Sequence, residues 1–203
     1  MLLYGIIVLV AISVISVLNI FLNSFMNLPW YHYVIATLIY AVAVFAVDAI
    51  VAILIRKMPE KHFDANKKFF TASKKELNFY RKIGVKSWKD HIPELGQFTD
   101  FHKDKIYEPT NNKYVSRFLL EASYGVSIHF WSIFFGMLIV FIDWRMFLGN
   151  SNLCLTIALP VIVVNAILNF LPICVLKTNI PSLKLLYKIN AKRDAAKVNK
   201  ESN

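Results

Sequence analysis

The chain has 203 residues and a formal net charge of +10, and 57% of its residues are hydrophobic whereas only 18% are charged. With a mean hydropathy of +0.49, this composition excludes a water-soluble globular domain and indicates a membrane protein with about half of its length in the bilayer. The two cysteines, Cys154 and Cys174, lack CxxC spacing, so neither a disulfide framework nor a metal site is predicted.

Four apolar segments are each long enough to cross about 30 Å of hydrocarbon as a helix. They cover residues 2–23, 31–55, 118–142 and 153–176. The first has no basic region before it and is longer than the apolar core of a cleavable signal, so we expect it to remain as a span. The predicted fold class is an all-α membrane protein with four transmembrane helices.

The basic residues are confined to two parts of the chain. Of 23 Lys and Arg, 15 lie in residues 56–117 and 7 in residues 177–203, and only Arg145 lies elsewhere. This bias predicts that both termini and the central segment are cytoplasmic, with connections 24–30 and 143–152 outside, in a multi-pass protein of the cell membrane. The predicted divisions are helices one and two (1–55), a basic cytoplasmic segment (56–117), helices three and four (118–176) and a basic cytoplasmic tail (177–203). Membrane lipids are the expected partners, and nucleic acid is not.

The central segment contains a predicted interfacial helix. Ser73 and Glu76 form a capping box, which marks a helix start. The apolar face that follows consists of Leu77, Tyr80 and Ile83. The remaining positions are mostly basic, a pattern typical of amphipathic helices at a membrane surface, and Gly84 is expected to end the helix. Residues 88–96 then form a polar loop. It is either a solvated connector or a substrate-facing loop, with Trp88 and His91 as its candidate binding residues.

The third apolar segment contains two ionisable residues, Glu121 and His129. Such groups cost at least ~2.5 kcal/mol each in hydrocarbon and usually face a cavity or a partner. Gly125, His129, Ser132 and Gly136 follow Glu121 by 4, 8, 11 and 15 positions, which places all five on one helix face. Glu121 and His129 are then about 12 Å apart along the axis, and a ligand can lie across the gap at Gly125. The alternative is a polar seam that packs against another helix.

Other segments offer partners for His129, which needs a second group to fix its tautomer if it acts as a base. Asn165 and Asn169 lie one turn apart in the fourth segment, although interhelical hydrogen bonding explains them equally well. Asp48 in the second segment is a further candidate. It lies two turns from Arg56, so pairing with a basic group at the interface is its alternative.

Several of these elements together resemble the glycosyl-4,4'-diaponeurosporenoate acyltransferase family of bacterial membrane proteins. The resemblance is carried by Phe79-Tyr80-Arg81-Lys82, Trp88-Lys89, Glu121 and His129-Phe130-Trp131-Ser132, followed by Asn169, Pro172 and residues 177–183. It covers roughly residues 79–188. The family's basic segment reads Arg-Tyr-Asn-Arg-Pro-Arg-Leu, whereas this chain has Lys177, Ile180 and Ser182 at the three arginine positions. Recognition of an anionic donor or headgroup would then depend on other residues, such as Lys184 and Lys188.

The resemblance implies transfer of a fatty acyl group to a sugar hydroxyl of a glycosylated isoprenoid, as in staphyloxanthin-type carotenoid synthesis. Such a reaction needs a base and a donor for the developing oxyanion. We assign the base to His129, the oxyanion donor or the group that orients the base to Asn165 or Asn169, and sugar binding to Glu121. Residues assigned to substrate binding are Gly125, Ser132, His91, Trp88, Lys177 and Asn179.

No cofactor is expected, and the acyl donor, such as acyl-CoA, would be a co-substrate. Neither GxSxG nor a His-x4-Asp acyltransferase box is present, which favours direct transfer over an acyl-enzyme. Two other classes remain open: a non-catalytic membrane subunit or lipid-binding partner, and a different membrane enzyme or carrier. The sequence also leaves open whether the chain forms a homo-oligomer.

Overall fold

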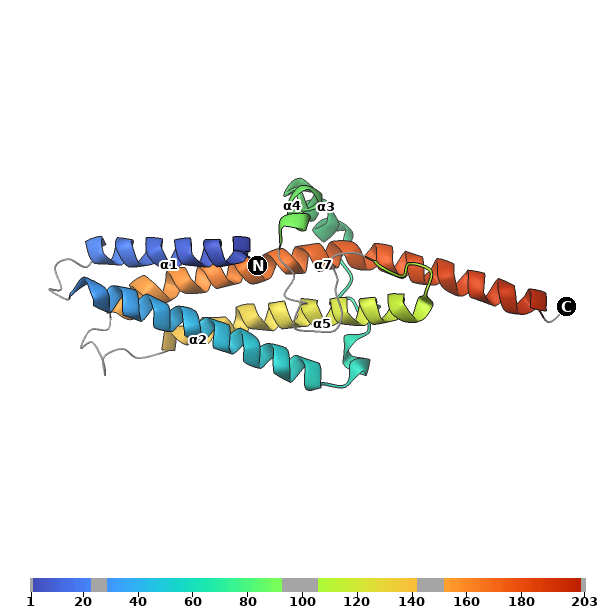
Figure 1. The fold of residues 1–203 in the computed structure, drawn as a ribbon, viewed down its shortest axis with the longest axis horizontal. Helices are drawn as coiled ribbons and strands as arrows, with labels where there is room; N and C mark the ends of the chain where they lie inside the picture. Colours follow the sequence, from blue (N-terminus) through green and yellow to red (C-terminus); the bar gives the residue numbers. More distant parts are fainter. Residues whose placement is uncertain (1, 23–28, 93–105, 142–151, 202–203) are drawn as a thin grey trace. The chain divides into compact units, whose positions relative to one another are not determined.

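The structure is a computed structural model that describes residues 2–22, 29–92, 106–141 and 152–201. These residues are mainly helical, and none of them forms a strand. The elements are α1 (Leu2–Leu22), α2 (Trp30–Lys57), η2 (Glu60–Phe63), α3 (Lys74–Lys82), α4 (Val85–Trp88), η3 (Lys89–His91), α5 (Asn112–Gly136), η5 (Met137–Phe141) and α7 (Asn152–Glu201) (Figure 1). The described part of the chain therefore confirms the all-α prediction.

Among the described residues, four helical stretches are long and apolar enough to cross a membrane. They are Gly5–Leu22, Trp30–Lys57, Asn112–Phe141 and Leu155–Lys197. Each overlaps one of the predicted apolar segments, so the prediction of four candidate spans is confirmed. The predicted connections 24–30 and 143–152, Arg145 and the end of the predicted polar loop lie wholly or mostly outside the described residues.

The third long helix begins before its apolar residues do. The side-chain oxygen Oδ1 of Asn111 accepts hydrogen bonds from the backbone N–H groups of Lys113 (3.0 Å) and Tyr114 (3.2 Å). An asparagine in this position satisfies N–H groups that have no partner within the helix. Helix α5 therefore starts at Asn112, whereas hydropathy alone had placed the start at Phe118.

The fourth long helix continues far beyond its predicted end at Leu176. Ile180, Leu183 and Asn190 are all buried, and their spacing of three or seven residues keeps them on one side of a helix. Leu183 forms a small core with Phe118, and Asn190 Nδ2 donates to the Pro109 carbonyl at 2.7 Å. The basic tail is thus helical because its buried side packs against the start of α5.

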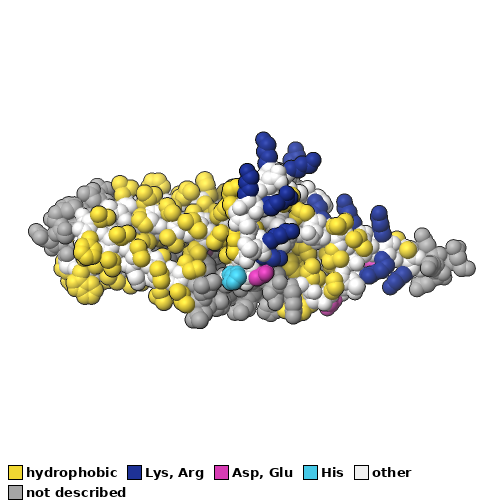
Figure 2. Space-filling view, turned by 90° about the horizontal axis from the view of Figure 1, so that it is seen from above, with side chains coloured by type: hydrophobic (Ala, Val, Ile, Leu, Met, Phe, Trp, Pro, Cys, Tyr) yellow, Lys and Arg dark blue, Asp and Glu magenta, His cyan; other side chains and the backbone are white. Residues whose placement is uncertain are grey.

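The chain divides into two compact units, which contain different segments of α5 and α7. The first consists of Met1–Ile55 and Ile128–Leu171, and the second of Arg56–Ser127 and Pro172–Asn203. The core of the first unit is Ile15, Tyr33, Ala36, Tyr40, Val44, Ile139, Ile157, Ala158 and Val161. Side chains visible on the first unit are mainly hydrophobic, whereas Lys and Arg side chains gather on the second (Figure 2). Exposed Phe21, Val42 and Leu155 are examples of the apolar surface.

In the first unit, α1 is tied to α7 by a side chain that compensates for a proline. Pro160 has no N–H group, so the Thr156 carbonyl four residues earlier lacks its usual helical donor. Asn19 Nδ2 donates to that carbonyl at 3.0 Å and to the Ile15 carbonyl at 2.9 Å. Asn19 is only 2% exposed, so these bonds satisfy an amide that would be costly to bury unpaired.

In the second unit, α3 begins and ends as predicted. Ser73 Oγ accepts from the Glu76 N–H at 3.2 Å, and Glu76 Oε2 accepts from the Ser73 N–H at 2.7 Å, which confirms the capping box. Gly84 follows with φ of 68°, a left-handed conformation that glycine adopts without steric cost. The predicted stop at this glycine is also confirmed.

Leu77 and Tyr80, two of the three residues of the predicted apolar face of α3, pack against α7. Tyr80 forms a core with Cys174 of α7, and Leu77 packs against it. Burial raises the pKa of the Tyr80 hydroxyl to about 12. Phe79 and Ile83 remain 46% and 37% exposed. If α3 lies at the membrane surface, these two apolar side chains are the ones that would contact lipid. The location of α3 at the membrane surface stays a prediction.

Candidate functional site

The half-buried imidazole of His129 lies in the first unit, on the part of α5 that packs there. Its Nδ1 atom is 2.8 Å from Oδ1 of Asn169 on α7. Asn169 is 4% exposed. Because Asn169 also bonds the Asn165 side chain, the structure brings together three of the four candidate catalytic residues: His129, Asn165 and Asn169.

The amide of Asn169 has a defined orientation. Its Nδ2 donates to Asn165 Oδ1 at 2.9 Å, to the Asn165 carbonyl at 3.1 Å and to Asp48 Oδ2 at 3.2 Å. Reversing the amide would place its oxygen against three acceptors, which is unfavourable. Asn169 Oδ1 must therefore face His129 as an acceptor, and His129 Nδ1 must carry the proton.

This hydrogen bond determines the tautomer of the neutral ring. With the proton on Nδ1, the lone pair lies on Nε2. A lone pair on Nε2 and a fixed ring are what a general base requires. The arrangement therefore can accept a proton from a hydroxyl that reaches Nε2.

Asp48 and Ser132 complete the polar cluster of the first unit. The side chains of Ser132 and Asn165 lie beside the Asp48 carboxyl group. Ser132 is fully buried, and neither its Oγ nor Asp48 Oδ1 has a hydrogen-bond partner in the described ranges. The expected alternative for Asp48, a basic partner, is not what the structure gives, because its hydrogen bond is to Asn169.

Glu121 belongs to the second unit and has a different partner. Its carboxylate forms two contacts with the Arg56 guanidinium, Oε2 to Nη2 at 3.1 Å and Oε1 to Nη1 at 3.4 Å. The guanidinium carbon also lies 5.7 Å from the ring centre of Tyr124, and Phe63 packs on that ring at 4.4 Å. Glu121 is only 7% exposed, and the ion pair explains this burial of a charged residue without a ligand. Sugar binding by Glu121 therefore remains a prediction.

A cleft of about 1060 Å³ lies beside this ion pair in the second unit. It is lined by Glu60, Lys61, Phe63, Asp64, Ala65, Glu108, Asn111, Lys113, Tyr114, Ser116, Arg117, Leu120, Glu121 and Tyr124. Acidic and basic side chains are present in similar numbers, and three rings accompany them. Such a lining suits an uncharged polar group better than a polyanion, because a polyanion would meet four carboxylates.

The two predicted glycines of α5 are helix-packing positions. A Cβ atom at Gly125 would lie 2.7 Å from Leu176 Cδ1, and a Cβ at Gly136 would lie 2.5 Å from Asn165 Nδ2. Both distances are too short for real contacts. The space beside Gly125, which we expected to admit a ligand, is therefore occupied by Leu176, in agreement with the packing alternative.

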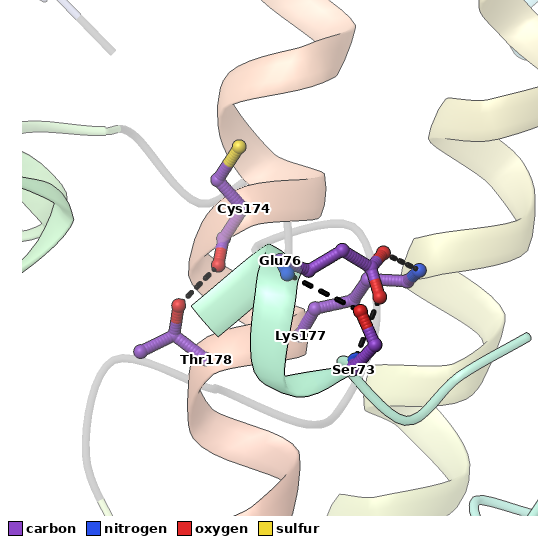
Figure 3. A network of polar contacts seen from close by, with 5 residues as sticks. All are labelled: Ser73, Glu76, Cys174, Lys177 and Thr178. Atoms are coloured by element: carbon purple, nitrogen blue, oxygen red, sulfur yellow. Dashed lines mark hydrogen bonds and ion pairs between the residues drawn. The ribbon is translucent and has the colours of Figure 1, made fainter. Parts of the chain in front are cut away.

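Lys177 is paired within the second unit. Its Nζ is 2.8 Å from Glu76 Oε1, and Figure 3 shows this pair next to the capping box of α3. The Lys177 ammonium, followed by the hydrogen bonds from Ser73, lowers the pKa of Glu76 from 4.5 to about 2. Thr178 Oγ1 donates to the Cys174 carbonyl at 2.7 Å. The structure therefore gives Lys177 a role in attaching α3 to α7.

The other predicted binding residues are dispersed. Trp88 ends α4 and donates from Nε1 to the Ile83 carbonyl at 2.9 Å. His91 ends η3 and is exposed, and Asn179 is half-buried on α7. Of the candidate site residues, His129, Asn165, Asn169 and Ser132 are the ones that the structure groups together. Arg56 was not predicted as the partner of Glu121, because no sequence pattern distinguishes it from the other Lys and Arg residues among the 15 in residues 56–117.

Comparison with protein families confirms the resemblance seen in the sequence. The model of the glycosyl-4,4'-diaponeurosporenoate acyltransferase family matches residues 59–189. The matched residues include His129, Asn165 and Asn169, whereas Asp48 and Arg56 lie outside them. No curated protein and no solved structure matches the chain. Because the match covers well over half of its length, the chain belongs to the glycosyl-4,4'-diaponeurosporenoate acyltransferase family.

Proposed function

We propose that this protein transfers a fatty acyl group to a sugar hydroxyl of a glycosylated carotenoid or related glycolipid in the membrane. The family's name supports the reaction class. The observation that carries the proposal is the 2.8 Å hydrogen bond between His129 Nδ1 and Asn169 Oδ1. It gives the ring the tautomer that a base for the acceptor hydroxyl needs.

The proposed reaction is a direct transfer from a fatty acyl thioester such as acyl-CoA. Nε2 of His129 takes the hydroxyl proton while the hydroxyl oxygen forms a bond to the acyl carbon. The carbon–sulfur bond then breaks, and the thiolate leaves as a thiol with the proton that His129 returns. Asn169 orients the base in this scheme, since both of its N–H donors are directed at Asn165 and Asp48.

Replacement of His129 by glutamine tests the proposal. We expect His129→Gln to lower ester formation by about 100-fold or more, because general acid–base catalysis typically contributes 10²–10⁴-fold. The assay follows transfer from a fatty acyl-CoA to a glycosylated diaponeurosporenoate by mass spectrometry, with the full chain in lipid nanodiscs. Membrane yield and elution volume would show that the variant is folded.

His32→Gln is the matched control. His32 lies near the start of α2, and its Nδ1 also faces an oxygen, the Pro29 carbonyl at 3.3 Å. We expect this variant to retain the activity of the original chain. Undiminished ester formation by His129→Gln would show that His129 is not the base and would favour the alternative of a non-catalytic membrane subunit.

A further inference from the structure

Asp48 is the only acidic residue of α2. A carboxyl group within a candidate membrane-spanning helix is unfavourable unless the protein compensates it. The compensation here is specific, because Asp48 Oδ2 accepts from Asn169 Nδ2 at 3.2 Å. Asn169 in turn accepts from His129 at 2.8 Å. The three side chains therefore form a continuous hydrogen-bonded chain that ends on the proposed base.

The acceptors around Asn169 are not equivalent. The Asn165 side chain also accepts from Asn169 Nδ2, but a primary amide can rotate and present its N–H groups instead. The Asn165 carbonyl is a fixed acceptor on α7 itself, but it engages one of the two N–H groups of the Asn169 amide, so the other N–H group still needs an acceptor. An aspartate presents two oxygens, so its side chain cannot reverse its role toward Asn169 while it is ionised.

We propose that Asp48 is a positioning residue for His129. By holding the Asn169 amide with its oxygen toward the imidazole, Asp48 keeps the proton on Nδ1 and the lone pair on Nε2. It acts through Asn169. The consequence for catalysis rests on the proposed function, but the tautomer itself can be measured without any substrate.

Nitrogen-15 NMR of the full chain, labelled at histidine and held in lipid nanodiscs, tests the proposal. Ring-nitrogen shifts report which nitrogen carries the proton, and the His129 signal is identified by its loss in His129→Gln. We expect the Nδ1–H form in the original chain. Asp48→Leu and the less disruptive Asp48→Ser remove the acceptor, so both should move the ring toward the Nε2–H form that free imidazoles prefer.

Two further variants make the test specific. Asp48→Glu keeps a carboxylate, which cannot reverse its role toward Asn169, so it should retain the Nδ1–H form. Thr37→Val removes a buried hydroxyl of α2 that donates only to the Tyr33 carbonyl, so it should leave the ring unchanged. An unaltered tautomer in both Asp48→Ser and Asp48→Leu would overturn the proposal. An equal change of the His129 tautomer in Thr37→Val would also overturn the proposal, because the loss of any buried polar group of α2 would then change the tautomer.

Activity measurements separate this inference from the proposed function. Asp48→Ser should lower kcat for ester formation by about tenfold or more, with the KM of the acceptor unchanged, because part of the contribution of the base is lost. An altered tautomer with full ester formation would support the positioning role and contradict the function of His129 as a base. Loss of activity in His129→Gln with an unaltered tautomer in Asp48→Ser and Asp48→Leu would support His129 as the base and contradict the positioning role of Asp48.

Discussion

At the scale of single residues, membrane helices must satisfy each backbone carbonyl that a proline leaves without its donor. The bond from Asn19 Nδ2 to the Thr156 carbonyl, at 3.0 Å, meets this need beside Pro160. We predict that Asn19→Leu destabilises the protein by about 1 kcal/mol, in the range measured for hydrogen bonds between membrane helices. Unfolding by denaturant in detergent micelles would measure the change.

A second substitution tests whether Asn19 stabilises the protein because Pro160 leaves the Thr156 carbonyl without its helical donor. Pro160→Ala restores an N–H group that can donate to the Thr156 carbonyl within α7. The cost of Asn19→Leu should therefore be smaller in a Pro160→Ala background than in the original chain. Additive effects of the two substitutions in this double-mutant cycle would contradict the coupling.

At the scale of elements, α3 is held to α7 by a charged pair whose strength depends on pH. The pKa of Glu76 is lowered to about 2, mainly by Lys177. A lowered pKa in the folded state stabilises the fold above the ordinary value of 4.5, and this stabilisation is lost as the pH falls from 4.5 toward 2. We predict that Glu76→Gln flattens the dependence of the thermal midpoint on pH in this range.

Glutamine is the informative replacement because it can still complete the capping box. It removes the charge but leaves an acceptor for the Ser73 N–H group, which now bonds Glu76 Oε2 at 2.7 Å. Lys177→Gln should flatten the profile as well, since Lys177 is the main cause of the lowered pKa. A profile that keeps its original slope in both variants would show that the pair does not form.

Local signals explain which parts of these elements were predictable. The capping box at Ser73 and the stop at Gly84 follow from neighbouring residues, and the structure confirms both. The continuation of α7 past Leu176 depends on contacts with the start of α5, such as Leu183 with Phe118. Hydropathy falls at the basic residues whether or not the helix continues, so it cannot reveal this extension.

At the scale of the whole molecule, spacing along one helix identified polar side chains on a common face, but it did not select their partners in other helices. Glu121 and His129 were predicted to share a face of one helix, yet their partners are Arg56 and Asn169, which come from other helices. The residue types were informative, because each buried polar group required a partner. The choice among partners depended on tertiary packing, which a single sequence does not contain.

The charge bias along the chain predicts one orientation for all four candidate spans. Cytoplasmic termini and an inward central segment follow from the Lys and Arg distribution. In a background of Cys154→Ala and Cys174→Ala, we expect Lys82→Cys and Lys192→Cys to react with a membrane-impermeant maleimide only after cells are lysed. Asn27→Cys and Asn150→Cys, in the predicted outer connections, should react in intact cells. Reaction of Lys192→Cys in intact cells would place the C-terminus outside and contradict the predicted orientation.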